Sequence, residues 1–226
     1  MIYAMSDLHG CDDLYFKMLE KINFSDNDTL YILGDVIDRG EGGIKILLDM
    51  MKRKNVIPIL GNHDYTCAYL LKRLKCKATE ELKEIFKDWL NDGGLVTYQE
   101  YKKLDEETKK EIVEYLNCFS IFEEIETQSG SFFLSHTVPS KEMMSDFDNI
   151  DWHELIVGHQ EYDQVYFEDK YIVTGHTPTG LIDFTSKGKI FEMNNNIAID
   201  CGAVFCGTLG CICLDTMEKF YVSIEK

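Results

Sequence analysis

The feature that most constrains this chain is the repeated junction of an apolar run with a short polar motif. Residues 30–33 lead into Gly34-Asp35-Val36-Ile37-Asp38-Arg39-Gly40, and four other runs of β-formers end in the same way, at residues 6–10, 61–64, 135–137 and 175–178. Open α/β folds place their sites at the carboxyl ends of strands. Five strand ends are therefore expected to bring Asp, His and Asn side chains to one rim.

The order of the expected elements predicts an α/β fold. Runs at 2–5, 29–33 and 56–60 alternate with amphipathic helices at 11–22 and 44–51, which implies a mainly parallel sheet with right-handed crossovers. After residue 118 the pattern changes to short strands, expected at 119–125, 132–134, 155–157, 171–173, 197–199, 211–214 and 220–224. We predict two mixed β-sheets packed as a sandwich and flanked by helices. The acidic stretch 139–152 is expected to be a mobile loop near the rim.

Residues 65–118 are predicted to form helices inserted between these two parts. Thr79 and Asp105 are expected to cap helices, and Asn91-Asp92-Gly93-Gly94 is expected to end one. The insert contains none of the motif histidines, so we expect a helical cap that contributes to substrate selection. With 226 residues, 45% of them hydrophobic, the chain is expected to form a single domain, 1–226, with this insert at about 65–118.

Composition excludes several classes of function. A net charge of −17 argues against a nucleic-acid groove, which needs clustered Lys and Arg. No apolar run approaches the roughly 20 residues that span a bilayer, and Asp7 lies too close to Met1 for a cleavable signal, so we expect no membrane segment and a cytoplasmic location. The eight cysteines include no C-x-x-C pair and are expected to be free thiols. The oligomeric state has no signature in the sequence.

Six residues at predicted strand ends have side chains that commonly bind metals. Taken singly, an Asp-x-His pair is more often a capping pair, and a lone buried histidine usually completes a hydrogen bond of the core. Their joint occurrence favours a metal site, because carboxylate, amide and imidazole ligands together suit Mn, Fe or Zn. The six residues are Asp7, His9, Asp35, Asn62, His136 and His176.

These motifs carry a resemblance to a known family. Ser6-Asp7-Leu8-His9-Gly10, Gly34-Asp35-x-x-Asp38-Arg39-Gly40, Gly61-Asn62-His63-Asp64, Ser135-His136 and Gly175-His176-Thr177-Pro178 resemble, in order, the signature of calcineurin-like metallophosphoesterases. The second motif is similar to that of the phosphoprotein phosphatase branch, which includes bacterial and phage serine/threonine phosphatases and symmetrical bis(5'-nucleosyl)-tetraphosphatases. Residues 89–94 with Thr97, and 199–203, are also similar to segments of bacterial members, so the resemblance extends from residue 2 to residue 203.

The resemblance implies two divalent metal ions, with Mn first and Fe or Zn as alternatives. Asp7, His9 and Asp35 would hold one ion, and Asp35, Asn62, His136 and His176 the other. Asp35 would bridge them, since a carboxylate has two anionic oxygens to share between cations ~3.5–4 Å apart. The pair would acidify a water molecule, and the resulting hydroxide would attack phosphorus without a phosphoenzyme.

Three further residues are implied to act on the substrate. Arg39 would bind phosphate oxygens through its planar guanidinium, although a surface salt bridge is the ordinary alternative. His63 would protonate the leaving group, and Asp38 would orient His63 and favour its charged form.

The chain departs from the branch at two positions that concern the site. Asp64 stands where glutamate is usual, and we expect a modest change in the contacts around His63. No arginine follows Arg73, so the second phosphate-binding arginine of many members is missing. His159 lies at the nearest equivalent position, and substrate contact and a plain surface histidine remain equal alternatives for it.

The leading function predicted from the sequence is a serine/threonine phosphoprotein phosphatase that hydrolyses phosphomonoesters. The nearest alternative is a symmetrical bis(5'-nucleosyl)-tetraphosphatase, which needs the same centre and a dinucleotide substrate. A second alternative is a catalytically weak regulatory scaffold, which the complete set of ligand-type residues disfavours.

Overall fold

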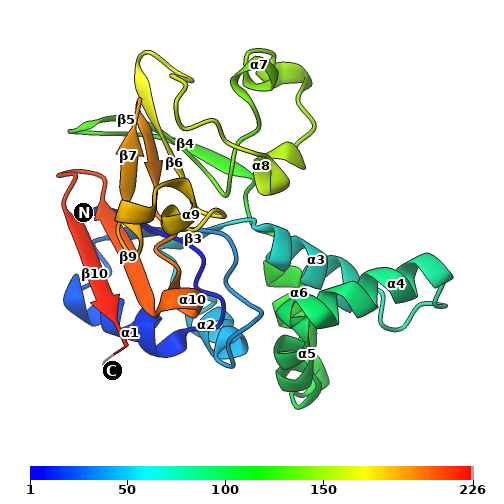
Figure 1. The fold of residues 1–226 in the computed structure, drawn as a ribbon. Helices are drawn as coiled ribbons and strands as arrows, with labels where there is room; N and C mark the ends of the chain where they lie inside the picture. Colours follow the sequence, from blue (N-terminus) through cyan, green and yellow to red (C-terminus); the bar gives the residue numbers. More distant parts are fainter. Residues whose placement is uncertain (225–226) are drawn as a thin grey trace.

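The apolar runs near the start of the chain form the centre of the first sheet. A computed structural model (Figure 1) describes residues 1–224. Its first sheet has five strands in the order β10-β9-β1-β2-β3. β1, β2 and β3 are parallel to one another, as predicted, whereas β9 and β10 extend the sheet in antiparallel fashion. The strands are β1 (Ile2–Met5), β2 (Thr29–Leu33), β3 (Val56–Ile59), β9 (Thr208–Cys213) and β10 (Lys219–Ser223).

The second sheet forms from the short strands of the later chain. Its order is β4-β5-β6-β8-β7, with β5, β6 and β8 parallel and an antiparallel strand at each edge. The strands are β4 (Phe122–Thr127), β5 (Gly130–Ser135), β6 (Lys170–Thr174), β7 (Phe191–Met193) and β8 (Asn196–Ala198).

The two sheets pack face to face because side chains alternate along their strands. In the first sheet Ala4 and Leu33 point towards the second sheet, where they meet Phe132 and Val173 in one buried cluster. Met5, next to Ala4, points the other way and packs among the helices α1 (Asp12–Lys21) and α2 (Gly43–Met50). The predicted sandwich of two mixed sheets flanked by helices is confirmed.

The outer face of the second sheet is covered by the segment between β5 and β6. Phe133 and Ile172 on this face bury Met144 and Leu155. These two residues belong to the short helices α7 (Lys141–Met144) and α8 (Glu154–Val157), with a 3-10 turn, η2 (Phe147–Asn149), between them. The stretch expected to be an irregular loop therefore has local structure and one anchored side chain.

Two predictions about the strands were wrong. Residues 155–157 form part of helix α8 and not a strand, and neighbouring Leu155 and Ile156 are both buried, which a helix end allows and an alternating strand does not. The strand expected to begin at residue 119 begins at Phe122, after Ser120 has made an isolated bridge to Ile59.

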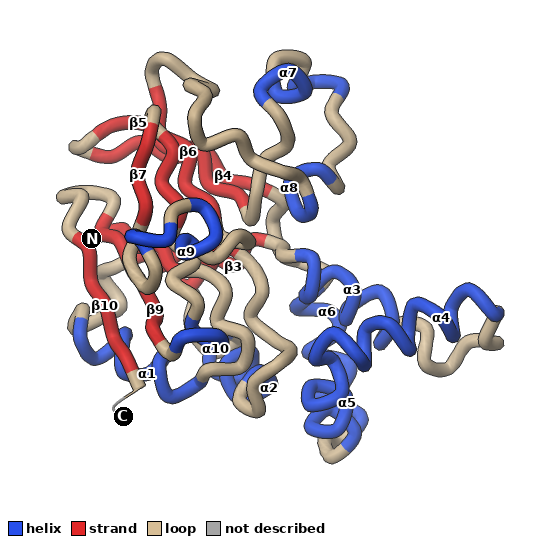
Figure 2. The backbone as a smooth tube through the Cα atoms, viewed as in Figure 1, coloured by secondary structure: helices blue, strands red, loops and turns tan. Residues whose placement is uncertain are grey.

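The insert forms a helical lobe beside the sandwich. Figure 2 shows its helices, in blue, projecting away from the red strands. Thr79 accepts a hydrogen bond from the Leu82 amide, and Asp105 accepts one from Thr108, so both predicted caps are confirmed. The elements are α3 (Asn62–Leu71), α4 (Glu80–Trp89), a kink η1 (Leu90–Gly94) with non-helical Asp92 and Gly93, α5 (Leu95–Lys102) and α6 (Glu106–Leu116).

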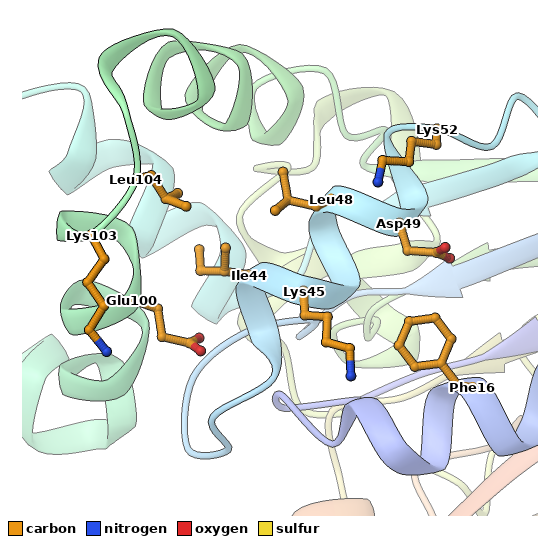
Figure 3. Close-up of a pocket in the computed structure, with 9 residues that line it drawn as sticks. All are labelled: Phe16, Ile44, Lys45, Leu48, Asp49, Lys52, Glu100, Lys103 and Leu104. Carbon is orange, nitrogen blue, oxygen red and sulfur yellow. The ribbon is translucent and has the colours of Figure 1, made fainter.

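A pocket of about 440 Å³ lies where the lobe meets the sandwich helices (Figure 3). Phe16 of α1, Ile44 of α2 and Leu104 just after α5 line it together with lysine and acidic side chains. None of the residues proposed for metal or phosphate binding lines this pocket. Among the described residues, no helix has the length and apolar character needed to cross a bilayer.

Candidate active site

The ends of β1, β2 and β3 in the first sheet and of β5 and β6 in the second deliver all the candidate residues. The loops after β1 and β2 run side by side, because the Asp7 amide donates to the Gly34 carbonyl at 3.0 Å and the His9 amide to that of Asp35 at 2.9 Å. A Cβ atom on Gly10 would lie 2.3 Å from the Gly40 carbonyl oxygen, so this approach requires glycine. The residues delivered are Asp7, His9, Asp35, Asp38, Arg39, Asn62, His63, His136 and His176.

Backbone strain is concentrated in these loops. Six of the candidate residues have a positive φ, between 40° and 71°, a region that residues other than glycine seldom adopt. Such conformations persist only where the surrounding structure imposes them, and they gather at functional sites. The six are Asp7, His9, Asp35, Asp38, Arg39 and His176.

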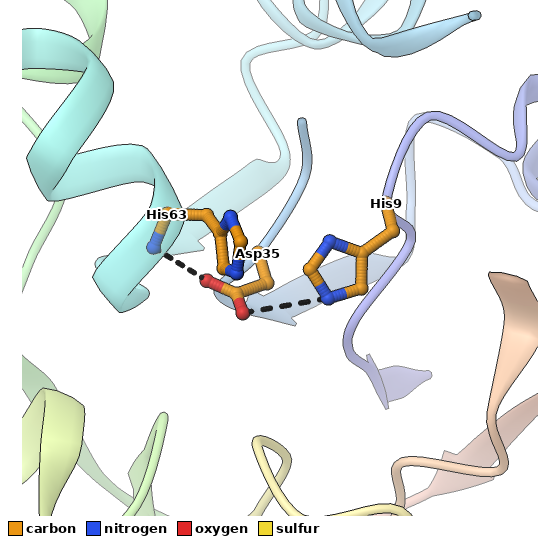
Figure 4. A group of neighbouring side chains, drawn as sticks. All are labelled: His9, Asp35 and His63. Carbon is orange, nitrogen blue, oxygen red and sulfur yellow. Dashed lines mark hydrogen bonds and ion pairs between the residues drawn. The ribbon is translucent and has the colours of Figure 1, made fainter. Parts of the chain in front are cut away.

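Asp35 lies between two groups of histidines. Its Oδ2 is 3.5 Å from His9 Nε2 and 3.5 Å from His136 Nε2, while its Oδ1 accepts a hydrogen bond from the His63 amide at 3.0 Å (Figure 4 shows the His9 and His63 contacts). Burial alone would raise the pKa of Asp35, but the nearby His136 and His9 outweigh it and lower that pKa. Asp35 is thus an ionised carboxylate at the centre of the cluster.

On the other side of Asp35, three donor atoms meet at one point. Asn62 Oδ1 is 3.0 Å from His136 Nε2 and 3.1 Å from His176 Nδ1, and these two nitrogens are 3.1 Å apart. Asp7 Oδ2 accepts a hydrogen bond from the main-chain amide of His176 at 2.9 Å, which ties the loop after β1 to the His176 loop. One hydrogen atom cannot form hydrogen bonds with all three of these atoms at once, whereas one cation can bind all three as ligands.

Two of the histidines are fixed in orientation by main-chain carbonyls. Nδ1 of His9 lies 3.0 Å from the Ile37 oxygen, and Nδ1 of His136 lies 2.7 Å from the Leu33 oxygen. A carbonyl can only accept, so both Nδ1 atoms carry the proton and both Nε2 lone pairs point into the cluster. Burial lowers the pKa of His9 to about 4, and burial followed by the nearby His136 lowers that of His176 to about 4. His9 and His176 are therefore neutral imidazoles, which is the form of histidine that binds metals.

The His63–Asp38 pair lies next to this cluster and is held by the helical lobe. His63 Nδ1 is 2.9 Å from Asp38 Oδ2. The same oxygen accepts from Trp89 Nε1 at 2.8 Å, and Asp38 Oδ1 accepts from the Thr97 hydroxyl at 2.7 Å. Burial opposes the charged form of His63, but the hydrogen bond that His63 donates to Asp38 and the negative charges of Asp35 and Asp38 together outweigh burial and raise the pKa of His63.

Arg39 reaches both parts of the site. Its Nη1 donates to His9 Nε2 at 2.6 Å and its Nη2 to His63 Nε2 at 2.9 Å. Asp92, in the kink η1, lies 3.5 Å from Arg39 Nη2 and 3.6 Å from His63 Nε2. An arginine with two donors at the mouth of a histidine cluster is well placed to bind an anion there.

A family model described as calcineurin-like phosphoesterase matches residues 1–207, which is most of the chain. The chain belongs to this family. The resemblance of its motifs is thereby confirmed, and the geometry above is the arrangement that this calcineurin-like phosphoesterase builds from them.

Curated relatives of this phosphoesterase include two named symmetrical bis(5'-nucleosyl)-tetraphosphatase. One, from Wigglesworthia glossinidia brevipalpis, is 33% identical over 113 residues, which is 45% of this chain and 42% of the relative. The other, from Haemophilus ducreyi, is 39% identical over 87 residues, 37% of this chain and 32% of the relative. The matched segments thus span less than half of each relative's length.

Solved structures support the fold. A protein provisionally named a diadenosine tetraphosphatase aligns over 98% of this chain and 92% of its own, with a TM-score of 0.69 and 17% identity. A serine/threonine phosphatase from Saccharomyces cerevisiae aligns over 100% of this chain and 79% of its own, with a TM-score of 0.61 and 15% identity. At such identities the likeness concerns the fold alone.

The residues of this calcineurin-like phosphoesterase fit a divalent metal centre. Asp7, Asp35 and Asp200 are each no more than 3% exposed. Burial, followed by the charges of Asp200 and Asp35, raises the pKa of Asp7 well above its ordinary value. Burial likewise raises the pKa of Asp200 to about 7. A bound cation would favour the charged forms of these buried carboxylates, and the oriented imidazoles offer further ligand atoms for it.

Several residues important to this arrangement were not assigned a role from the sequence. They are Trp89, Thr97 and Asp92, and all three come from the insert, where residues 89–94 and Thr97 resemble a segment of bacterial family members. Their roles depend on a long-range contact with Asp38 and Arg39 that no local pattern reveals.

The structure also places the two positions at which the sequence departs from the family pattern. Asp64 accepts from the Val36 amide at 3.1 Å and the Gly61 amide at 3.4 Å, so its side chain braces the loop of Asp35 instead of contacting the His63 ring. His159 is exposed and lines a pocket with Thr177 and Leu181, apart from Arg39.

We expect Trp89→Phe to lower kcat about three- to tenfold, because Asp38 loses one charge-assisted donor and orients His63 less firmly. Metal content should not change, since Trp89 contacts none of the candidate metal ligands. Steady-state kinetics with metal analysis test this, with Trp152→Phe as the matched control: Trp152 is the other tryptophan and is 38% exposed. Equal kcat values for the two variants would contradict the positioning role.

Proposed function

We propose that this chain is a metal-dependent hydrolase that cleaves dinucleoside tetraphosphates symmetrically, at the middle of the polyphosphate. The observation that carries the proposal is the convergence of oriented histidines, Asn62 and the shared carboxylate Asp35 beside Arg39 and the His63–Asp38 pair. The names of the curated relatives support the dinucleotide substrate. They favour the alternative from the sequence over its leading prediction, a phosphoprotein phosphatase.

The metal ligands proposed are those expected from the sequence: Asp7, His9, Asp35, Asn62, His136 and His176. Bound divalent cations there would supply Lewis acidity and acidify water, which is the chemistry that hydrolysis of a phosphate linkage requires. The donor set suits Mn²⁺, with Fe²⁺ or Zn²⁺ as alternatives.

The chain's own residues would bind the substrate and move the proton. Arg39 turns its two donors from His9 and His63 to the non-bridging oxygens of a phosphate. This frees His63 Nε2, which can then carry a proton and deliver it to the departing oxygen, while Asp38 holds Nδ1. Trp89 and Thr97 keep Asp38 in place during this exchange.

Product analysis tests the substrate. The Mn²⁺-loaded chain is expected to convert diadenosine tetraphosphate to ADP alone, because cleavage in the middle of the polyphosphate gives two identical halves. Chromatography of the products, beside a panel of phosphoserine and phosphothreonine peptides, measures this. AMP with ATP as products, or faster turnover of the peptides, would contradict the proposal. Tight metal binding without turnover of any of these substrates would favour the scaffold alternative.

A further inference from the structure

A second pocket opens beside the metal cluster, on the side of Arg39 and His176. Its volume is about 490 Å³, and Leu181, Phe184 and Phe205 line it. These side chains are strongly exposed, at 79%, 81% and 65% respectively. We call this space the Phe205 pocket. Large apolar side chains exposed together in a cavity indicate a surface that a ligand covers.

The pocket is built by two short helices and the 3-10 turn η3 (Phe184–Ser186), at the end of the second sheet. α9 (Thr179–Ile182) follows the His176 loop, α10 (Ala203–Cys206) follows β8, and both lie in front of the sandwich in Figure 1. Gly202 and Gly207 bracket α10 with φ values of 77° and 72°, which other residues rarely adopt. The position of Phe205 is therefore fixed by turns at both ends of its helix.

Phe205 is directly linked to the proposed phosphate-binding group. The guanidinium carbon of Arg39 lies 5.1 Å from the centre of the Phe205 ring, while its two Nη atoms donate to His9 and His63. Most of the ring remains open in spite of this contact. A ligand whose phosphate meets Arg39 would thus have an aromatic surface next to that phosphate.

We propose that the Phe205 pocket binds the nucleobase of the substrate, a nucleoside polyphosphate, with Phe205 as the stacking residue. The inference rests on the proposed function and names the site that would recognise the base. A planar base suits the exposed rings of Phe205 and Phe184, because a phenyl ring stacks on any nucleobase whatever its hydrogen-bonding groups. Lys187 also lines the pocket and adds a positive charge on a chain of net charge −17, which suits an anionic nucleotide better than a lipid chain.

Binding of a matched pair of ligands tests the pocket without requiring turnover. Adenosine 5'-(α,β-methylene)diphosphate and methylenediphosphonate share the phosphonate group and differ in the adenosine. On the Mn²⁺-loaded chain, calorimetry is expected to show about tenfold tighter binding of the adenosine ligand. Phe205→Leu should remove most of this preference because it keeps an apolar side chain but loses the ring, and Phe205→Trp should retain it.

Phe16→Leu is the matched control, since it removes a half-buried ring from the pocket of Figure 3. An unchanged adenosine preference in Phe205→Leu would overturn the inference. The inference would also be overturned if Phe205→Leu kept the preference for adenosine but lost affinity for a phosphoserine peptide with a neighbouring leucine. A chain that prefers adenosine through Phe205 but does not cleave diadenosine tetraphosphate would refute the proposed function and support the pocket.

Discussion

Replacing Asp35 with asparagine is expected to abolish hydrolysis, with a loss on the order of a thousandfold or more, because the proposed bridging carboxylate is removed. Asp35 Oδ2 faces both His9 and His136, so an amide there leaves each proposed cation without a shared anionic oxygen. Elemental analysis after gel filtration should find the metal content reduced from about two ions per chain to less than one.

The charge-matched control is Asp169→Asn, which changes an exposed carboxylate before β6. The fold of Asp35→Asn should be checked by circular dichroism, since Asp35 Oδ1 also accepts from the His63 amide. A folded Asp35→Asn variant that keeps its full complement of metal would refute the bridging role.

The strand ends could be predicted because an apolar run and a short polar motif meet at each of them. The runs before Asp7, Asp35 and Asn62 are apolar, and each stops at a short polar motif. Local sequence decides such features, since a buried parallel strand needs a continuous apolar run and the site needs polar groups after it.

Features that depend on tertiary contacts could not be predicted in this way. The run at 155–157 contains only a few apolar residues, which do not distinguish a strand from a helix, and its contacts with Phe133 and Ile172 decide for α8. β7 was missed because its exposed Glu192 and Met193 give an edge strand little apolar signal.

The same reason explains what the sequence missed in the site. The positive φ values of Asp38 and Arg39 are strained conformations, which propensities do not foresee because the surrounding contacts impose them. The Arg39 amide donates to the Gly93 carbonyl at 3.0 Å, so the lobe fixes this loop directly. The insert thus supports the proposed catalytic residues, a role that goes beyond the substrate selection expected for it.

His63→Asn is expected to leave both metal ions bound and to slow hydrolysis in proportion to the basicity of the leaving group. The side chain of His63 points to Asp38 and Arg39, and its loss removes the proton donor but none of the proposed ligands. General acid catalysis contributes about 10²- to 10⁴-fold, so alkyl phosphates should lose activity in this range. Aryl phosphates and diadenosine tetraphosphate should lose less, because their leaving groups depart with little protonation.

A plot of log kcat against leaving-group pKa should therefore be steeper for the variant than for the parent chain. Equal slopes would contradict the role of His63 as the acid, and a loss of metal from His63→Asn would show that His63 acts as a ligand. Asp38→Asn should reproduce the steeper slope more weakly, since Trp89 and Thr97 would still hold residue 38 in place.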